Sequence, residues 1–109
     1  MITDKQIKKL VGLIVNEVNP KKIFLIGSYA ANTQTKNSDV DLIVVVEDDL
    51  DKKERRNKIC HLNLLLAIPE LMFPKDMFLY SEKEYEKLKN NSQSFLFGAL
   101  QQSKNLYGR

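Results

Sequence analysis

The segment Asp39–Val46 constrains the fold more than any other part of the chain. Apart from its two acids it consists only of valine, leucine and isoleucine, and such a run is typical of a strand covered on both faces. Ile23–Ile26 is a shorter run of the same kind, and Lys75–Tyr80 is a third, after a loop framed by Pro69 and Pro74. We therefore expect a small mixed central sheet flanked by helices, in the α/β (mixed α+β) class.

Four segments around these strands have the apolar spacing of amphipathic helices. The expected helices are about Asp4–Val18, Asp51–Ala67, Ser81–Asn90 and Phe95–Leu100. Thr3 with Gln6, and Ser81 with Glu84, form capping-box patterns at two of the helix starts. Pro20 stops the first helix, because proline cannot continue one. The large apolar residues around the third strand are expected to fill the core: Met72, Phe73, Met77 and Phe78.

Length and composition indicate one ordinary globular domain over residues 1–109. Hydrophobic residues make up 43% of the chain and charged residues 28%, which excludes a fibrous or disordered protein. The most apolar stretch, Leu62–Pro69, is far shorter than the roughly 20 residues that span a bilayer. Since the N-terminus also lacks a leader pattern, we expect a cytoplasmic protein without a membrane span. Cys60 is the only cysteine, so no internal disulfide can form.

The charge of the chain gives only a mild indication of its ligand. The formal net charge is +3, from 17 basic and 14 acidic side chains spread along the sequence. This excess is too small and too dispersed to predict nucleic-acid binding, although it suits a small anionic ligand. A nucleic-acid-processing transferase, whose binding would weaken steeply with salt, is therefore the interpretation with the least support.

Two acids, Asp39 and Asp41, stand at alternate positions before the main apolar run. Because strand side chains alternate, both carboxylates are expected on one face, about 7 Å apart along the backbone. Two negative charges in an otherwise buried strand repel each other and are costly unless they are paired or coordinate a metal. Carboxylate oxygens suit Mg²⁺, so the pair predicts a divalent-metal site.

Asp76 lies inside the third apolar strand, where a solitary acid again needs a reason. If that strand neighbours the second, three carboxylates meet, and they can hold two metal ions about 4 Å apart for phosphoryl or nucleotidyl transfer. Gly27 and Ser28 follow the first strand directly. Glycine allows close backbone approach to a phosphate, and the N–H groups of a following helical turn and the serine hydroxyl can donate to the anion.

Each of these features also has an ordinary structural explanation. Gly-Ser is a common turn dipeptide, Ser-Asp-x-Asp suits a solvated strand start, and Asp76 fits an exposed edge strand. What favours a site is their joint order, with Ser38 placed 10 positions after Ser28 and Asp76 placed 35 positions after Asp41.

Two segments, Gly27-Ser28-Tyr29-Ala30-Ala31-Asn32 and Ser38-Asp39-Val40-Asp41-Leu42, resemble the Gly-Ser-x-Ala-Arg-Gly and Ser-Asp-x-Asp-Leu signature of minimal nucleotidyltransferases in the DNA polymerase beta superfamily. The similarity runs through nearly the whole chain and implies a nucleotidyltransferase fold. It implies that Asp39, Asp41 and Asp76 are catalytic carboxylates that hold two Mg²⁺ ions, with Mn²⁺ as a substitute. By the same resemblance Gly27 and Ser28 contact the triphosphate of ATP, and Asp76 helps to deprotonate the incoming hydroxyl.

The chain departs from this signature where Ala31-Asn32 replace its Arg-Gly. Asn32 is the milder change, because asparagine tolerates the left-handed conformation better than most residues. Ala31 removes a positive group near the phosphates. Lys36 in the same loop is the candidate replacement for nucleotide binding, and an ordinary solvated lysine is the alternative. The departure makes nucleotide binding better supported than catalysis.

Stand-alone relatives of this kind are commonly encoded beside a helical HEPN protein, and the pair resembles a toxin–antitoxin system in which AMP is attached to a partner tyrosine. The resemblance thus implies an antitoxin that transfers AMP to a HEPN-type toxin. The acceptor site would come from that partner or from another copy in a homo-oligomer. The missing arginine leaves one alternative open, a non-catalytic nucleotide-binding antitoxin or interaction module with the same fold.

Overall fold

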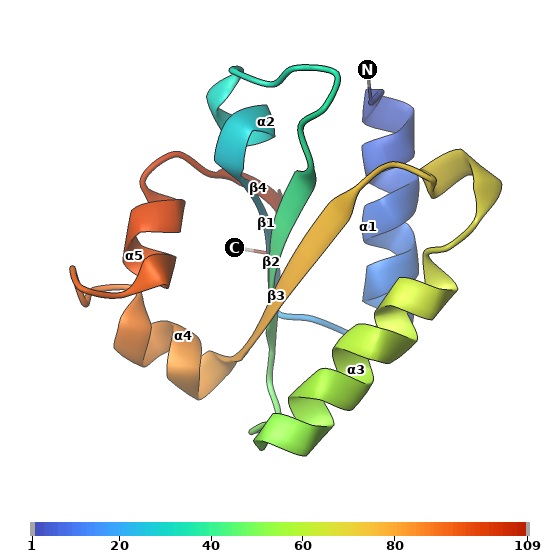
Figure 1. The fold of residues 1–109 in the computed structure, drawn as a ribbon. Coiled ribbons are helices and arrows are strands. Elements are labelled where there is room, and N and C mark those ends of the chain that lie inside the picture. The colour runs from blue at the N-terminus through green and yellow to red at the C-terminus, as the bar shows by residue number, and fades with distance from the viewer. Residues whose placement is uncertain (1, 109) are drawn as a thin grey trace.

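A four-stranded sheet forms the centre of the computed structural model, which describes residues 2–108 (Figure 1). The strands are β1 (Lys22–Ile26), β2 (Val40–Val46), β3 (Lys75–Ser81) and β4 (Lys104–Tyr107). They lie in the order β3-β2-β1-β4. Strand β1 pairs antiparallel with both β2 and β4, whereas β2 and β3 pair in parallel. The sheet is therefore mixed, as the sequence predicts.

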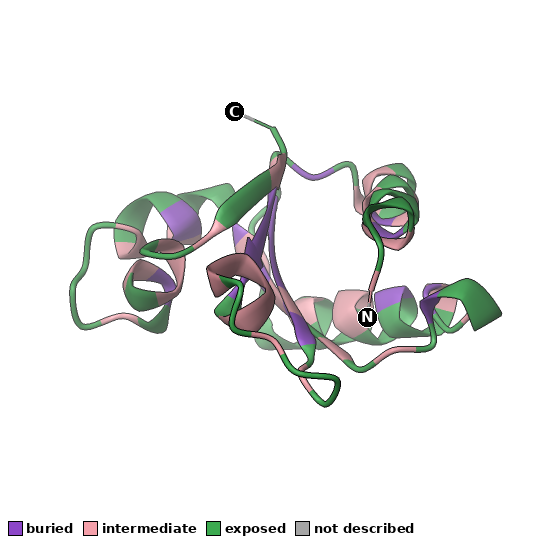
Figure 2. Cartoon of the chain, turned by 90° about the horizontal axis from the view of Figure 1, so that it is seen from above, coloured by how far each residue is buried: buried purple, intermediate pink, exposed green. Residues whose placement is uncertain are grey.

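Helices cover both faces of this sheet. They are α1 (Asp4–Val18), α2 (Gly27–Ala31), α3 (Lys52–Leu65), α4 (Glu82–Leu88) and α5 (Phe95–Leu100), with a 3-10 turn, η1, at Pro69–Leu71. Helices α1 and α3 lie on one face and α4 and α5 on the other (Figures 1 and 2). None of the helices within residues 2–108 is long and apolar enough to cross a bilayer.

Side-chain caps define the starts of the longer helices. Thr3 with Gln6 and Ser81 with Glu84 form the expected capping boxes, and Asp51 with Glu54 forms a third one at the start of α3. In each box the cap oxygen accepts an otherwise unpaired N–H of the first turn. These caps place the helix boundaries within a few residues of the predicted ones.

The core is divided by the sheet into two layers. On the α1 and α3 side, alternate residues of β2 such as Leu42 and Val44 pack with Leu10, Ile14 and Leu62. The intervening β2 residues, Ile43 and Val45, face Tyr85 of α4 and Leu96 of α5. Strand β2 is thus covered on both faces, which explains its continuous apolar sequence.

Two features of the fold are absent from the sequence-based prediction. These are the edge strand β4 and the turn η1. Helix α2 is the helical turn expected at Gly27-Ser28. The expectation that Met72 fills the core is also wrong, because its side chain is 73% exposed just after η1. Met77 does lie in the core, and Phe73 packs against it.

Candidate active site

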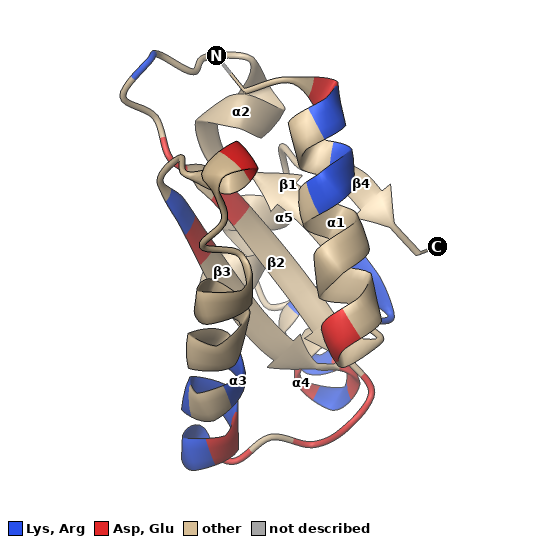
Figure 3. Ribbon diagram, turned by 90° about the vertical axis from the view of Figure 1, so that its right-hand side faces the viewer, with Lys and Arg blue, Asp and Glu red and all other residues tan. Residues whose placement is uncertain are grey.

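The register of the sheet brings the predicted acids onto neighbouring strands. Asp41 is the pairing partner of Asp76 across the parallel β2–β3 ladder, and on its other side Asp41 pairs with Ile26 at the end of β1. Asp39 lies one residue before β2. Figure 3 shows acidic residues at the same end of β2 and β3.

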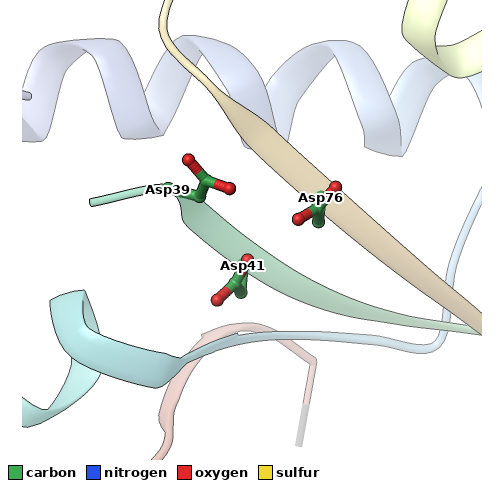
Figure 4. A group of neighbouring side chains, drawn as sticks. All are labelled: Asp39, Asp41 and Asp76. Carbon is green, nitrogen blue, oxygen red and sulfur yellow. The ribbon is translucent and has the colours of Figure 1, made fainter. Parts of the chain in front are cut away.

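The three carboxylates share one face of the sheet. Asp41 lies two residues before Ile43, and Asp76 lies two residues before Phe78, so each acid shares a face of its strand with that residue. Ile43 and Phe78 both pack on the α4 and α5 side. One carboxylate oxygen from each of Asp39, Asp41 and Asp76 can be chosen so that all three lie within 4.8 Å of one another (Figure 4). The convergence that strand alternation and sheet neighbourhood predict is therefore present.

This cluster carries negative charge without a cationic partner in the described part of the chain. Among the ion pairs within residues 2–108, none involves Asp39, Asp41 or Asp76. Burial, and then the charges of Asp76 and Asp39, raise the pKa of the Asp41 carboxyl. Like charges directly opposite each other in a sheet are destabilising. Three oxygen donors with unneutralised charge fit a hard divalent cation such as Mg²⁺.

Gly27 lies against this cluster, and the backbone there excludes other residues. Its φ is +73°, in the left-handed region that favours glycine. A Cβ at this position would lie 2.7 Å from Oδ2 of Asp41. Ser28 follows as the second residue of α2 and is half-buried. The Gly-Ser turn therefore adjoins the carboxylates on the β1 side of Asp41, while Asp76 lies on the β3 side.

The loop between α2 and β2 is held by its own hydrogen bonds. The N–H of Thr33 donates to the carbonyl of Ser28 (2.9 Å), and the N–H of Thr35 donates to Oγ of Ser38 (2.9 Å). Asn32 has φ +58°, so it adopts the left-handed conformation that its side chain tolerates. At the loop's end, the N–H of Val40 donates to the carbonyl of Pro74 (2.9 Å).

Ala31 and Lys36 lie at two different pockets. Ala31 lines a pocket of about 520 Å³ together with Gly27 and Ser28. The exposed Lys36 lines a separate one of about 260 Å³ with Ser38. The structure thus does not bring Lys36 into the pocket of the Gly-Ser turn, and its role in nucleotide binding stays a prediction.

The pocket at the Gly-Ser turn also contains residues that the sequence pattern did not single out. Phe95, Gly98 and Gln102, which lie on α5 or just after it, form its far side. The apolar stripe of α5 predicts burial for Phe95, yet this side chain is 56% exposed. The exposure of Phe95 is known only from the structure, so the sequence contained no signal for this wall of the pocket.

Comparisons with known proteins agree with this geometry. The model of the nucleotidyltransferase domain family matches residues 5–96. No curated protein matches the chain. A chain in the crystal structure of a toxin–antitoxin with AMP-PNP is 29% identical, with a TM-score of 0.55; the match covers 96% of this chain and 73% of that one.

Two further solved structures share the fold. A chain of the tri-AMPylated Shewanella oneidensis HEPN toxin in complex with MNT antitoxin is 23% identical, with a TM-score of 0.53, and the match covers 96% and 71% of the two chains. A Sulfolobus solfataricus protein assigned to the nucleotidyltransferases is 18% identical, with a TM-score of 0.60 and coverage of 97% and 86%. The family match extends over most of the sequence, including all three acids and the Gly-Ser turn. This chain belongs to the nucleotidyltransferase domain family.

Proposed function

We propose that this chain binds ATP with Mg²⁺ through Asp39, Asp41, Asp76, Gly27 and Ser28, and transfers AMP to a hydroxyl of a HEPN-type toxin. The single observation that supports this most is the convergence of three carboxylates within 4.8 Å beside a glycine-serine turn. Nucleotidyl transfer is catalysed mostly by positioning and charge neutralisation. A cluster of acids that can hold a metal ion, next to a turn that can bind phosphate, supplies both.

The two sides of the carboxylate cluster have different roles in this proposal. Gly27 and Ser28 lie on the β1 side of Asp41, so their N–H groups and the Ser28 hydroxyl hold the phosphates of ATP there. Asp76 lies on the β3 side, where the acceptor hydroxyl enters opposite the leaving pyrophosphate. Mg²⁺, held by Asp39, Asp41 and Asp76, neutralises phosphate charge when bound.

The transfer balances as a simple displacement. The acceptor oxygen forms a bond to the α-phosphorus of ATP while the bond from that phosphorus to the bridging oxygen breaks. The hydroxyl proton passes to the Asp76 carboxylate, and pyrophosphate leaves from the side of Gly27. The raised pKa of Asp41 is consistent with a cluster whose charge is not balanced by the protein alone.

The HEPN-type partner is inferred from the related complexes. One related structure is a toxin–antitoxin with AMP-PNP, and another contains a tri-AMPylated HEPN toxin with an MNT antitoxin. Asp39 and Asp76 are exposed, so the carboxylate cluster is open to solvent. An acceptor hydroxyl carried by a partner protein can therefore reach it.

The experiment is transfer of radioactive label from α-³²P-ATP to the product of the gene next to that of this chain, in Mg²⁺. We expect label on the partner with the wild type and no label with Asp76→Asn. Asp48→Asn, an exposed acid outside the cluster, is the matched control and should transfer normally. Absence of label with the wild type, although nucleotide binds, would refute the transfer step.

A second candidate is a non-catalytic nucleotide-binding antitoxin or interaction module. The observation that favours it is Ala31, which puts a methyl group beside Gly27 and Ser28 where the family signature has arginine. In that case the chain and the HEPN-type protein form a stoichiometric complex, and ATP leaves no label on either protein. Size-exclusion chromatography with the labelling assay separates the two candidates.

A further inference from the structure

The pocket at the Gly-Ser turn extends away from the carboxylates to a second wall formed by α5. It has a volume of about 520 Å³, within the range of small-molecule sites. Its near wall contains Gly27 and Ser28, and its far wall contains Phe95 and Gly98. A ligand held at the turn by its phosphates therefore has room beside it, next to an aromatic ring.

Phe95 is placed near the carboxylates by its packing on β3. Its ring centroid lies 5.0 Å from that of Phe78, with the planes tilted by 40°. Phe78 is two residues beyond Asp76 on the same face of β3. The pocket thus adjoins the carboxylate cluster at Gly27, which lies against Asp41, while Phe95 on its other wall packs on Phe78 of the strand that carries Asp76.

The ring of Phe95 is held in place although it is exposed. Ser94 caps α5, and its Oγ accepts from the N–H of Phe97 (3.0 Å) and donates to the carbonyl of Leu88 (2.8 Å). One side of the Phe95 ring rests on Phe78, and 56% of the residue remains accessible. A fixed, half-exposed aromatic surface favours stacking of a planar ring at little cost in side-chain entropy.

Gly98 keeps the space beside this ring open. A Cβ at Gly98 would have no neighbouring atom within 4 Å, and the residue lies one turn after Phe95 on the same side of α5. Gln102 and Thr33, which also line the pocket, offer an amide and a hydroxyl for hydrogen bonds. Aromatic stacking with a few polar groups is the chemistry that binds a nucleobase.

We propose that Phe95, Gly98 and Gln102 form the nucleoside subsite of this chain, with the base stacked on Phe95. This inference depends on the proposed function, because it takes the phosphates to lie at Gly27 and Ser28. It adds the residues that bind the base and so contribute to the choice of nucleotide.

The test compares ATP with inorganic tripolyphosphate, which carries the phosphates without a base. In Mn²⁺, Phe95→Ala should weaken ATP binding about tenfold, the usual effect of losing one base–aromatic stack, and leave tripolyphosphate binding unchanged. Phe95→Trp should restore ATP binding. Calorimetric titration gives both affinities, and circular dichroism checks that each variant is folded.

A second pair of variants tests the same pocket without removing the ring. Gly98→Leu fills the open space and should weaken ATP binding at least as much as Phe95→Ala, again without affecting tripolyphosphate. Gly12→Leu on α1 is the matched control, because a Cβ there also has no neighbour within 4 Å and the residue is likewise exposed and helical. This control should bind ATP as the wild type does.

The outcomes separate the two proposals. If ATP and tripolyphosphate bind the wild type and neither Phe95→Ala nor Gly98→Leu changes ATP affinity, the subsite is refuted and the proposed function stands. If these variants weaken the binding of ATP and of tripolyphosphate equally, base stacking is also refuted. It is likewise refuted if they lower acceptor labelling but leave ATP affinity unchanged. If the wild type binds neither ligand, the proposed function fails, and the subsite fails with it.

Discussion

Gly27 and Asp41 approach so closely that a single methyl group on the glycine would lie 2.7 Å from Oδ2 of the aspartate. The proposed phosphate-binding turn and the carboxylate cluster are therefore in direct contact, because a side chain at residue 27 would displace the Asp41 carboxylate. Gly27 also has φ +73°, which an alanine adopts only with strain.

Gly27→Ala should thus damage both folding and binding. We expect a loss of about 1–2 kcal/mol in the free energy of unfolding, from the left-handed backbone alone. Displacement of the Asp41 carboxylate should weaken Mn²⁺ and ATP binding at least tenfold. Urea unfolding and calorimetric titration measure the two effects, with Gly12→Ala as the control that keeps wild-type binding. Normal binding by Gly27→Ala would show that the turn and the cluster act independently.

Asp41→Asn should have opposite effects on stability with and without metal. In EDTA the variant relieves repulsion among three carboxylates, so its free energy of unfolding should rise by about 0.5 kcal/mol. In Mg²⁺ at 100 times the dissociation constant, the wild type should gain about 2.7 kcal/mol while the variant gains much less. Thermal unfolding in the two buffers measures this reversal.

Asp49→Asn is the control for that reversal, because Asp49 is an exposed acid outside the cluster. Its melting temperature should respond to Mg²⁺ as the wild type's does. A variant at Asp41 that is less stable than the wild type in EDTA would contradict the account of an unneutralised cluster.

Restoring the motif arginine should strengthen the site. Ala31 lines the same pocket as Gly27 and Ser28, so Ala31→Arg puts a guanidinium beside the proposed phosphates. A charge-assisted bidentate contact should raise ATP affinity about tenfold. Ala67→Arg, at an exposed position after α3, controls for net charge. Unchanged affinity in Ala31→Arg would place the phosphates elsewhere. A gain in AMP labelling would favour the enzyme over the non-catalytic module.

The contact between α3 and α4 predicts a pH dependence of stability. Glu84 accepts from the Ser81 N–H (2.9 Å) and from Nη2 of Arg55 (2.6 Å). Burial raises the pKa of Glu84, but these hydrogen bonds and the Arg55 charge outweigh it, so the pKa is lowered from 4.5. A carboxyl with a lowered pKa contributes stability above its unfolded pKa and loses it as the pH falls through the folded value.

Glu84→Gln should therefore cost about 1–2 kcal/mol at pH 7, and the difference from the wild type should shrink progressively below pH 4.5. Urea unfolding at pH 7 and pH 3 measures it. Glu86→Gln removes a surface ion pair with Lys89 and should cost only a few tenths of a kcal/mol. A Glu84→Gln difference that stays constant down to pH 3 would argue against the ionised contact.

Local sequence patterns predicted the elements that carry the acids. The apolar run of β2 and the two-residue spacing of Asp39 and Asp41 are local patterns, so both could be predicted from the sequence. The capping boxes at Thr3 and Ser81 are local in the same sense. The pairing of Asp41 with Asp76 was a conditional expectation, because strand order depends on contacts across the whole fold.

What escaped prediction lacks a local pattern. In β4 only Leu106 is half-buried, so the strand has no alternation and exists through its pairing with β1. A helical turn at Gly27-Ser28 was expected, but its extent was not, because the five residues of α2 are too few for a helical period to be visible. The pocket wall at Phe95 depends on how α5 packs over β3, and the apolar spacing of α5 predicts burial for that side chain instead.

We propose that Asp39, Asp41 and Asp76 hold a divalent cation together with a nucleotide. Calorimetric titration of Mn²⁺ and ATP into the wild type and into Asp39→Asn with Asp41→Asn tests this proposal. The control is Asp48→Asn with Asp49→Asn, which removes the same charge from two exposed acids. We expect only the first double variant to lose Mn²⁺-dependent ATP binding. Equal affinity in all three proteins would contradict it.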